Sequence, residues 1–273
     1  MSEAAMPTPS RPSGMRLISG LSLATLLIVL GVVIAFSVGR YPVSHVDLVT
    51  ALWSRLTNQP SGLSTATETV IFNIRGPRVI AAMLCGAALA VAGAAFQGLF
   101  RNPLVSPDIL GASSGAALGA VIGIYFSLGI LGIQGLAFAG GLVAVALVYM
   151  IGSAIRGGDT VLVLVLTGVV IGALLGAGVG LMKYLADPYN QLPAMTFWLL
   201  GSLAGTDKSD LLPLFGPVLA GTLVLFLLRW RMNAMSLPEE EARALGLATG
   251  PLRIAIVAAA TLVTAASVAA AGV

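Results

Sequence analysis

The feature that most constrains this chain is a stretch of 22 residues, 79–100, that contains no charged side chain. A helix of this length, rising about 1.5 Å per residue, crosses the roughly 30 Å hydrocarbon core of a bilayer. Similar apolar segments lie at 17–39, 108–128, 133–152, 160–184, 211–230 and 251–273. The sequence therefore predicts an all-α polytopic membrane protein, a transmembrane helix bundle with about seven spans.

Composition agrees with this class. Of 273 residues, 58% are hydrophobic and 9% are charged, whereas soluble domains have about 25% charged residues. The net charge of +3 comes from basic residues that are scattered singly, which argues against a nucleic-acid-binding surface. The single cysteine, Cys85, lies within segment 79–100 and cannot form an intrachain disulfide.

Segment 79–100 is bounded by polar and proline residues: Arg75, Pro77, Arg78, Arg101, Asn102 and Pro103. The next helix is predicted to begin at Ser106-Pro107-Asp108, which combines a capping oxygen, a proline without an N–H, and an acid in the first turn. Small residues recur every fourth position within the segment, at Gly86, Ala90, Ala94 and Gly98. This face is predicted to pack closely against protein rather than lipid.

The remaining segments predict accessory elements. Residues 1–14, rich in Ser, Pro and Ala, are predicted to be a disordered cytoplasmic N-terminus, and residues 15–273 a single transmembrane domain. A capping box at Ser44-x-x-Asp47, followed by Leu48, Leu52 and Leu56 on one face with Trp53 beside them, predicts a short interfacial helix. Residues 194–204 are apolar but too short to cross the bilayer, and are interpreted as re-entrant.

Two further patterns concern helix contacts. Glycines at four-residue spacing, Gly168, Gly172, Gly176 and Gly180, predict a groove for close helix packing. In the loop 232–250, Ser236-Leu237-Pro238-Glu239 forms a second capping box, Glu239, Glu240 and Glu241 suit a helix start, and Gly246 suits a left-handed stop. This loop is predicted to hold a helix of about two turns outside the lipid.

An ordered set of motifs resembles the signature of FecCD-type permeases, the membrane subunits of ABC importers for iron-siderophores, haem and cobalamin. It comprises Arg75-x-Pro77-Arg78, Gly86-Ala87-Ala88-Leu89-Ala90, Gln97, Arg101-Asn102-Pro103-Leu104, and Pro107-x-Ile109-Leu110-Gly111. The resemblance implies a multi-pass permease of the bacterial inner membrane with its N-terminus in the cytoplasm. It also implies about ten helices in the complete fold, so that this chain is incomplete at its C-terminus. The expected cargo is a ferric siderophore, with haem or cobalamin as alternatives.

The resemblance also implies partners and their contact residues. The expected assembly is a homodimer or paired permease with two ATP-binding subunits at the cytoplasmic face and a periplasmic binding protein. Arg75 and Arg78 match positions where the binding protein docks. The cytoplasmic loop 232–250 matches the coupling helix of the family, with contacts to the ATPase carried by Glu241, Ala242, Arg243, Leu245 and Gly246. The glycine-rich segment 160–184 matches a helix that lines the translocation path.

Other classes remain as alternatives. A secondary transporter or channel would place ionisable residues inside its spans, and none lies near the middle of a predicted span. A membrane enzyme would need a catalytic cluster; Gly111-x-Ser113-x-Gly115 resembles a nucleophile elbow, but the only histidine is His45. No phosphate-binding loop for ATP is present in the sequence, so ATP hydrolysis is expected in a partner subunit. The chain itself is expected to be no enzyme and to use no cofactor or metal.

Overall fold

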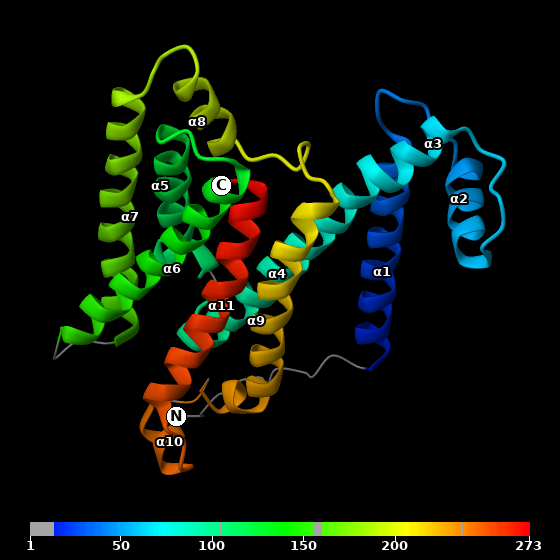
Figure 1. Cartoon of the computed structure of the whole chain (residues 1–273). Helices are drawn as coiled ribbons and strands as arrows, with labels where there is room; N and C mark the ends of the chain where they lie inside the picture. The colour runs from blue at the N-terminus through cyan, green and yellow to red at the C-terminus, as the bar shows by residue number, and fades with distance from the viewer. Residues whose placement is uncertain (1–13, 104, 156–159, 236, 238) are drawn as a thin grey trace, which may run out of the picture. The chain divides into compact units, whose positions relative to one another are not determined.

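A computed structural model describes residues 14–103, 105–155, 160–235, 237 and 239–273, and within these ranges the regular structure is entirely helical (Figure 1). Thirteen of the residues predicted to be disordered, together with Leu104, Ser236 and Pro238 of the predicted motifs, lie outside the described residues. The described chain divides into two compact units, one that ends at residue 79 and one that spans 80–273. The single transmembrane domain at 15–273 stays a prediction.

The first unit contains the helices α1 (Gly14–Ser37), α2 (His45–Thr57) and α3 (Thr65–Thr69), the π-helix η1 (Val70–Arg75), and the beginning of α4 (Gly76–Phe100). The capping box of α2 is confirmed, since the backbone N–H of Asp47 donates to the Ser44 hydroxyl and that of Ser44 to the Asp47 carboxylate. Of the predicted leucine face, only Leu48 is buried, beside Ala51 and Ile71, whereas Leu52 and Leu56 are exposed.

The second unit contains the remainder of α4 and eight further elements: η2 (Pro107–Leu110), α5 (Ala112–Tyr125), α6 (Ile130–Ala154), α7 (Thr160–Leu185), α8 (Gln191–Leu199), α9 (Lys208–Met235), α10 (Glu239–Ala244) and α11 (Thr249–Ala271). Six helices of the described chain are long and apolar enough to cross a membrane, and α5 is a shorter apolar helix of 14 residues. The predicted bundle of about seven spans is therefore confirmed as six to seven. The short segment predicted at 194–204 corresponds to α8, which ends at Leu199.

The predicted span at 108–128 differs from the structure at its beginning. Ser106 caps η2, a single 3₁₀ turn, and Gly111 then adopts a left-handed conformation with φ of 76°. The Asp108 carboxylate accepts a hydrogen bond of 3.0 Å from the backbone N–H of Ser113, in the first turn of α5. The long helix α5 thus begins at Ala112 and not at residue 108, because Ser106 and Asp108 belong to the separate 3₁₀ turn η2 that precedes it.

The face of α4 that carries Gly86, Ala90 and Ala94 is exposed in the described chain, and Gly98 is half-buried. No described helix of this chain covers this face, so the prediction that it packs against protein stays a prediction. The buried face carries Ala81, Cys85, Ala88, Ala92 and Ala95 instead. Because α4 has small residues on both sides, spacing alone could not identify the packed one.

Helix α11 is the central helix of the second unit (Figure 1). It packs against α9, α6 and α5, and most of its residues are buried. Two of its buried hydroxyls are satisfied within the helix, since Thr264 donates to the Ala260 carbonyl and Ser267 to the Val263 carbonyl. The buried Thr261 hydroxyl has no hydrogen-bond partner among the described residues. The bonds of Thr264 and Ser267 reduce the free-energy cost of burying their hydroxyls in an apolar bundle.

The closest helix pair in the second unit is α5 with α6, which meet through glycines. A Cβ atom at Gly115 would collide with the Gly140 carbonyl, and one at Gly119 would collide with the Leu136 carbonyl. A Cβ atom at Gly123 would lie 3.0 Å from the Cα atom of Ile133. Backbone therefore lies against backbone along most of α5, a contact that only glycine permits.

Gly119→Ala is expected to lower the apparent melting temperature of the detergent-solubilised protein, since the added methyl must push α5 and α6 apart at a cost of about 1–3 kcal/mol. Gly135→Ala on α6 is the matched control, because a Cβ there meets nothing within 4 Å. The control is expected to be neutral or slightly stabilising. Equal melting temperatures for both variants would contradict the glycine-mediated contact.

Candidate functional site

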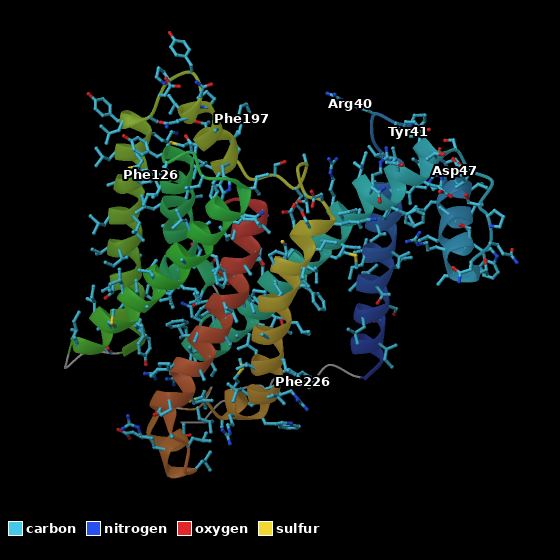
Figure 2. All side chains as sticks on the ribbon, in the orientation of Figure 1. Arg40, Tyr41, Asp47, Phe126, Phe197 and Phe226 are labelled. Carbon is cyan, nitrogen blue, oxygen red and sulfur yellow. The ribbon has the colours of Figure 1, made fainter. Side chains whose placement is uncertain are left out.

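Arg75, one of the two predicted docking residues, is engaged inside the first unit. Its side chain is only 8% exposed, and its guanidinium donates hydrogen bonds to the carbonyls of Phe36 and, at 2.6 Å, Tyr41. Gly39 leaves the space for this, since a Cβ atom there would collide with the guanidinium. Arg75 thus joins the end of α1 to the turn that follows, near Arg40 and Tyr41 in Figure 2. This geometry does not favour direct contact between Arg75 and a partner.

The same turn is held by a second polar contact. The Tyr41 hydroxyl lies 3.1 Å from the Thr67 hydroxyl, and hydrogen bonds with Thr67 and Ser64 lower the pKa of Tyr41. Ser64 in turn caps α3 by accepting from the backbone N–H of Thr67. The loop after α1 is therefore tied to both η1 and α3.

Arg78, the second predicted docking residue, lies in a different environment. It is half-buried in the first turn of α4, after the fully buried Pro77, and its Nε atom is buried without a hydrogen-bond partner among the described residues. The half-buried guanidinium can still donate to a partner's carboxylate through its terminal nitrogens, because its donors form a planar fork. Arg78 is therefore the better placed of the two for docking.

The predicted helix in the loop 232–250 is α10, and its end is a Schellman motif. The backbone N–H of Gly246 donates to the Arg243 carbonyl at 2.9 Å, and that of Leu247 to the Ala242 carbonyl at 3.2 Å. Gly246 has φ of 80°, as predicted for a left-handed stop. The second predicted capping box, at 236–239, falls partly on residues outside the described ones.

Four of the five predicted coupling residues divide into two groups, and the fifth, Gly246, ends the helix. Ala242 is 1% exposed and packs inward, and the Arg243 Nε donates to the Thr249 hydroxyl at 3.3 Å, at the start of α11. Glu241 is exposed and Leu245 is 64% exposed. The inward group holds α10 against the bundle, and the outward group leaves an acidic and an apolar side chain free for a partner.

The glycine series of α7 also divides. A Cβ at Gly168 would collide with the Ile109 carbonyl, and Gly172 lies close to the backbone of Gly111, so this half packs on η2 and the start of α5. Gly176 and Gly180 have nothing within 4 Å of a Cβ position. The continuous groove predicted from the spacing is therefore occupied along only half of its length in this chain.

The remaining motif residues form the turn between α4 and η2. Gln97 is exposed near the end of α4, and its carbonyl accepts from the Asn102 backbone N–H at 3.2 Å. Arg101 has a positive φ of 51°, and both it and Pro103 are exposed. Gly111, buried at the other end of η2, provides the close approach to α7.

One cavity with several polar side chains on a largely apolar wall was not predicted. It has a volume of about 820 Å³ and lies between α6, α8, α9 and the end of α11, at the end of the unit opposite to α10 (Figure 1; Phe197 in Figure 2). Gln134 donates to the Asp210 carboxylate at 3.4 Å on its wall. A hydrogen bond from the Ser209 hydroxyl lowers the pKa of Asp207. The wall of the cavity as a whole comes from four separate helices, so no local motif could indicate it.

Arg75→Gln is expected to loosen the turn after α1, since it removes charge-assisted hydrogen bonds to two carbonyls. A loss of about 2 kcal/mol corresponds to roughly thirtyfold faster hydrogen exchange at residues 36–44. Arg40→Gln, at an exposed position nearby, is the control and is expected to leave exchange unchanged. Slow exchange in both variants would show that Arg75 does not hold this turn.

Comparison with known proteins adds a family and a fold. A model of the FecCD transport family matches residues 26–273. The molybdate import system permease protein MolB of Haemophilus influenzae is 38% identical over 84% of this chain and 67% of its own length. A probable iron chelatin transport system permease protein of Helicobacter pylori is 41% identical over 67% of this chain and 55% of its own length. The chain thus spans little more than half to two thirds of the length of these relatives.

Further relatives are named for import of cobalamin and transport of hemin and achromobactin. Among solved structures, an inward-facing conformation described as a metal-chelate type ABC transporter matches with a TM-score of 0.80 and 35% identity. The match covers 93% of this chain and 76% of that chain.

Proposed function

Because this chain belongs to the FecCD transport family and is a multi-pass protein of the inner membrane, we propose that it is the permease subunit of an ABC importer. In this role it provides the helices through which the cargo moves, and ATP hydrolysis occurs in a partner subunit. The observation that carries the proposal is the family match over 26–273, together with a fold that agrees with a metal-chelate type transporter.

The proposed cargo is a ferric siderophore or a similar iron chelate. Relatives named for iron chelatin and achromobactin, and the metal-chelate type of the matching structure, support this class. Molybdate is the competing cargo, since the molybdate permease is 38% identical over 84% of this chain, and haem and cobalamin remain alternatives. Uptake of radioactive iron as a ferric siderophore, measured against radioactive molybdate in cells that lack other permeases for either, separates these cargoes.

The proposed contact with the ATPase is the outward face of α10. Leu245 gives an exposed apolar anchor and Glu241 an exposed acid, whereas Ala242 and Arg243 hold the helix on α9 and α11. Gly246 supports the contact indirectly, because its left-handed conformation turns the chain back towards α11. A short helix anchored at its end can transmit a push from a partner to the helices that it joins.

The proposed contact with a binding protein is centred on Arg78. Its side chain is only half-buried, and its place at the beginning of α4 suits an acidic side chain from the partner. Arg75 takes the role of a positioning residue, because its guanidinium is already used to join the end of α1 to the following turn.

The proposed contact with a second permease, either another copy of this chain or a paired subunit, lies on the open side of α7. Gly176 and Gly180 have free space around them, and Val170, Leu174 and Leu181 are more than half exposed. An apolar helix with exposed glycines allows another helix to approach closely. A path between two such helices would be lined by small side chains.

Leu245→Glu is expected to reduce co-purification of the ATPase subunit and cargo uptake at least tenfold, because it places a charge in the apolar centre of the contact. Leu56→Glu makes the same change at an exposed leucine of α2 and is expected to retain the ATPase. Ala242→Glu is unsuitable for this test, because burial of the new carboxylate would unfold α10. Full uptake and full ATPase retention in Leu245→Glu would contradict the proposed contact.

Gly176→Cys and Gly180→Cys, each in a Cys85→Ala background, are expected to form a disulfide between two copies of this chain when membranes are oxidised. Gly178→Cys is the control, because a Cβ there lies 3.2 Å from the Leu118 side chain inside the same chain. Crosslinked dimers would appear at twice the monomer mass on non-reducing gels. Equal crosslinking at all three positions, or at none, would contradict a homodimer through the open side of α7.

A further inference from the structure

A groove in the second unit is lined by residues of α9 and α11. Its apolar part has a volume of about 600 Å³ and is also walled by α6, with Tyr149 and Val145 among the lining residues. A second pocket of about 360 Å³ shares Ala255 with it and is lined by Arg231 and by the beginning of α11. The two spaces are therefore adjoining parts of one feature.

The spacing of the lining residues shows that the groove follows one face of each helix. Among the lining residues, Gly221, Val224, Leu228 and Arg231 follow one face of α9, and Pro251, Ala255, Ala258 and Leu262 follow one face of α11. Steps of three and four residues keep side chains on one side of a helix. The apolar groove and the pocket beside it thus extend along α9 as far as the Arg231 guanidinium, four residues before the end of that helix.

The end with Arg231 has the character of a membrane surface. Helix α9 ends at Met235, α6 ends at Ala154 and α11 begins at Thr249, and Tyr149 and Arg231 both lie in the final turns of their helices. Tyrosine and arginine are favoured where helices leave the hydrocarbon core. The beginning of α11, where the helix dipole is positive, also lines this pocket, and no side chain caps that end of the helix.

We propose that this groove binds one anionic phospholipid of the bilayer, with an acyl chain between α6, α9 and α11 and its phosphate at Arg231. The volume of the apolar part lies within the roughly 300–1,000 Å³ of typical ligand sites. Basic pockets between transmembrane helices recognise anionic headgroups through the same combination of charge and apolar cover. A bound lipid would fill the space between α9 and α11, the two helices that the loop carrying α10 connects. This proposal does not depend on the proposed function.

The test is native mass spectrometry of the full chain in detergent, titrated separately with phosphatidylglycerol and with phosphatidylcholine of the same acyl chains. One tightly retained phosphatidylglycerol is expected, and Arg231→Gln should weaken its binding about fivefold. Arg229→Gln is the charge-matched control, because that guanidinium lies 3.9 Å from the Phe226 ring and donates to the Phe226 carbonyl (Figure 2 labels Phe226). The control should bind as well as the parent.

A second pair of variants tests the apolar part. Ala258→Phe fills the groove at an exposed position of α11 and should abolish retention of the lipid, whereas Ala24→Phe on the exposed face of α1 should not. Excess inorganic phosphate should leave the lipid bound, since the acyl chain contributes to binding. The proposal would be overturned if both lipids were retained equally or if no lipid were retained. It would also be overturned if Arg231→Gln and Arg229→Gln weakened lipid binding equally, or if phosphate displaced the lipid.

Discussion

Close contact between small residues is the interaction on which the second unit depends. Apolar side chains gain little by leaving lipid for another apolar surface, so helices in a bilayer associate through van der Waals packing and short backbone distances. The glycines of α5 and α6 bring two backbones together, and Gly221 of α9 meets the Ala259 carbonyl and Val263 of α11 in the same way. Gly141 of α6 lies close to Ala265 of α11. Together these contacts hold α6, α9 and α11 side by side, and the groove between them follows from that arrangement.

Where helices end, the protein satisfies backbone groups with specific polar contacts. The Asp108 carboxylate accepts a hydrogen bond from a backbone N–H in the first turn of α5, and the Schellman motif ends α10. Arg75 donates hydrogen bonds to the carbonyls of Phe36 and Tyr41. Such contacts are needed because an unpaired carbonyl or N–H near lipid costs several kcal/mol. They also place the residues proposed for function, since Arg78 follows Arg75 on the same segment and Leu245 precedes the glycine that ends α10.

The division between packed and open faces gives the proposed importer its contact surfaces. The packed half of the glycine series on α7 holds that helix to the bundle, and the open half leaves a side for a second permease. The inward side of α10 anchors it, and the outward side is free for an ATPase subunit. In both helices, a single motif contains residues of two kinds, those that position the element and those that remain available to a partner.

The sequence by itself determined the class of the protein, the spans and several of their ends. Runs without charge can be stable in lipid only as helices, and the local motifs at Ser44, Ser106 and Gly246 act through contacts within a few residues, so they could be identified from the chain alone. Only the tertiary structure decided which face of α4 is packed, that Arg75 is engaged while Arg78 keeps a free N–H, and that Ala242 points inward. The cavity beside α8 and the groove ending at Arg231 also required it, because their walls come from helices far apart in the chain. Small residues at helical spacing show that close packing is possible on a face, but the partner that occupies it depends on long-range contacts that no local pattern records.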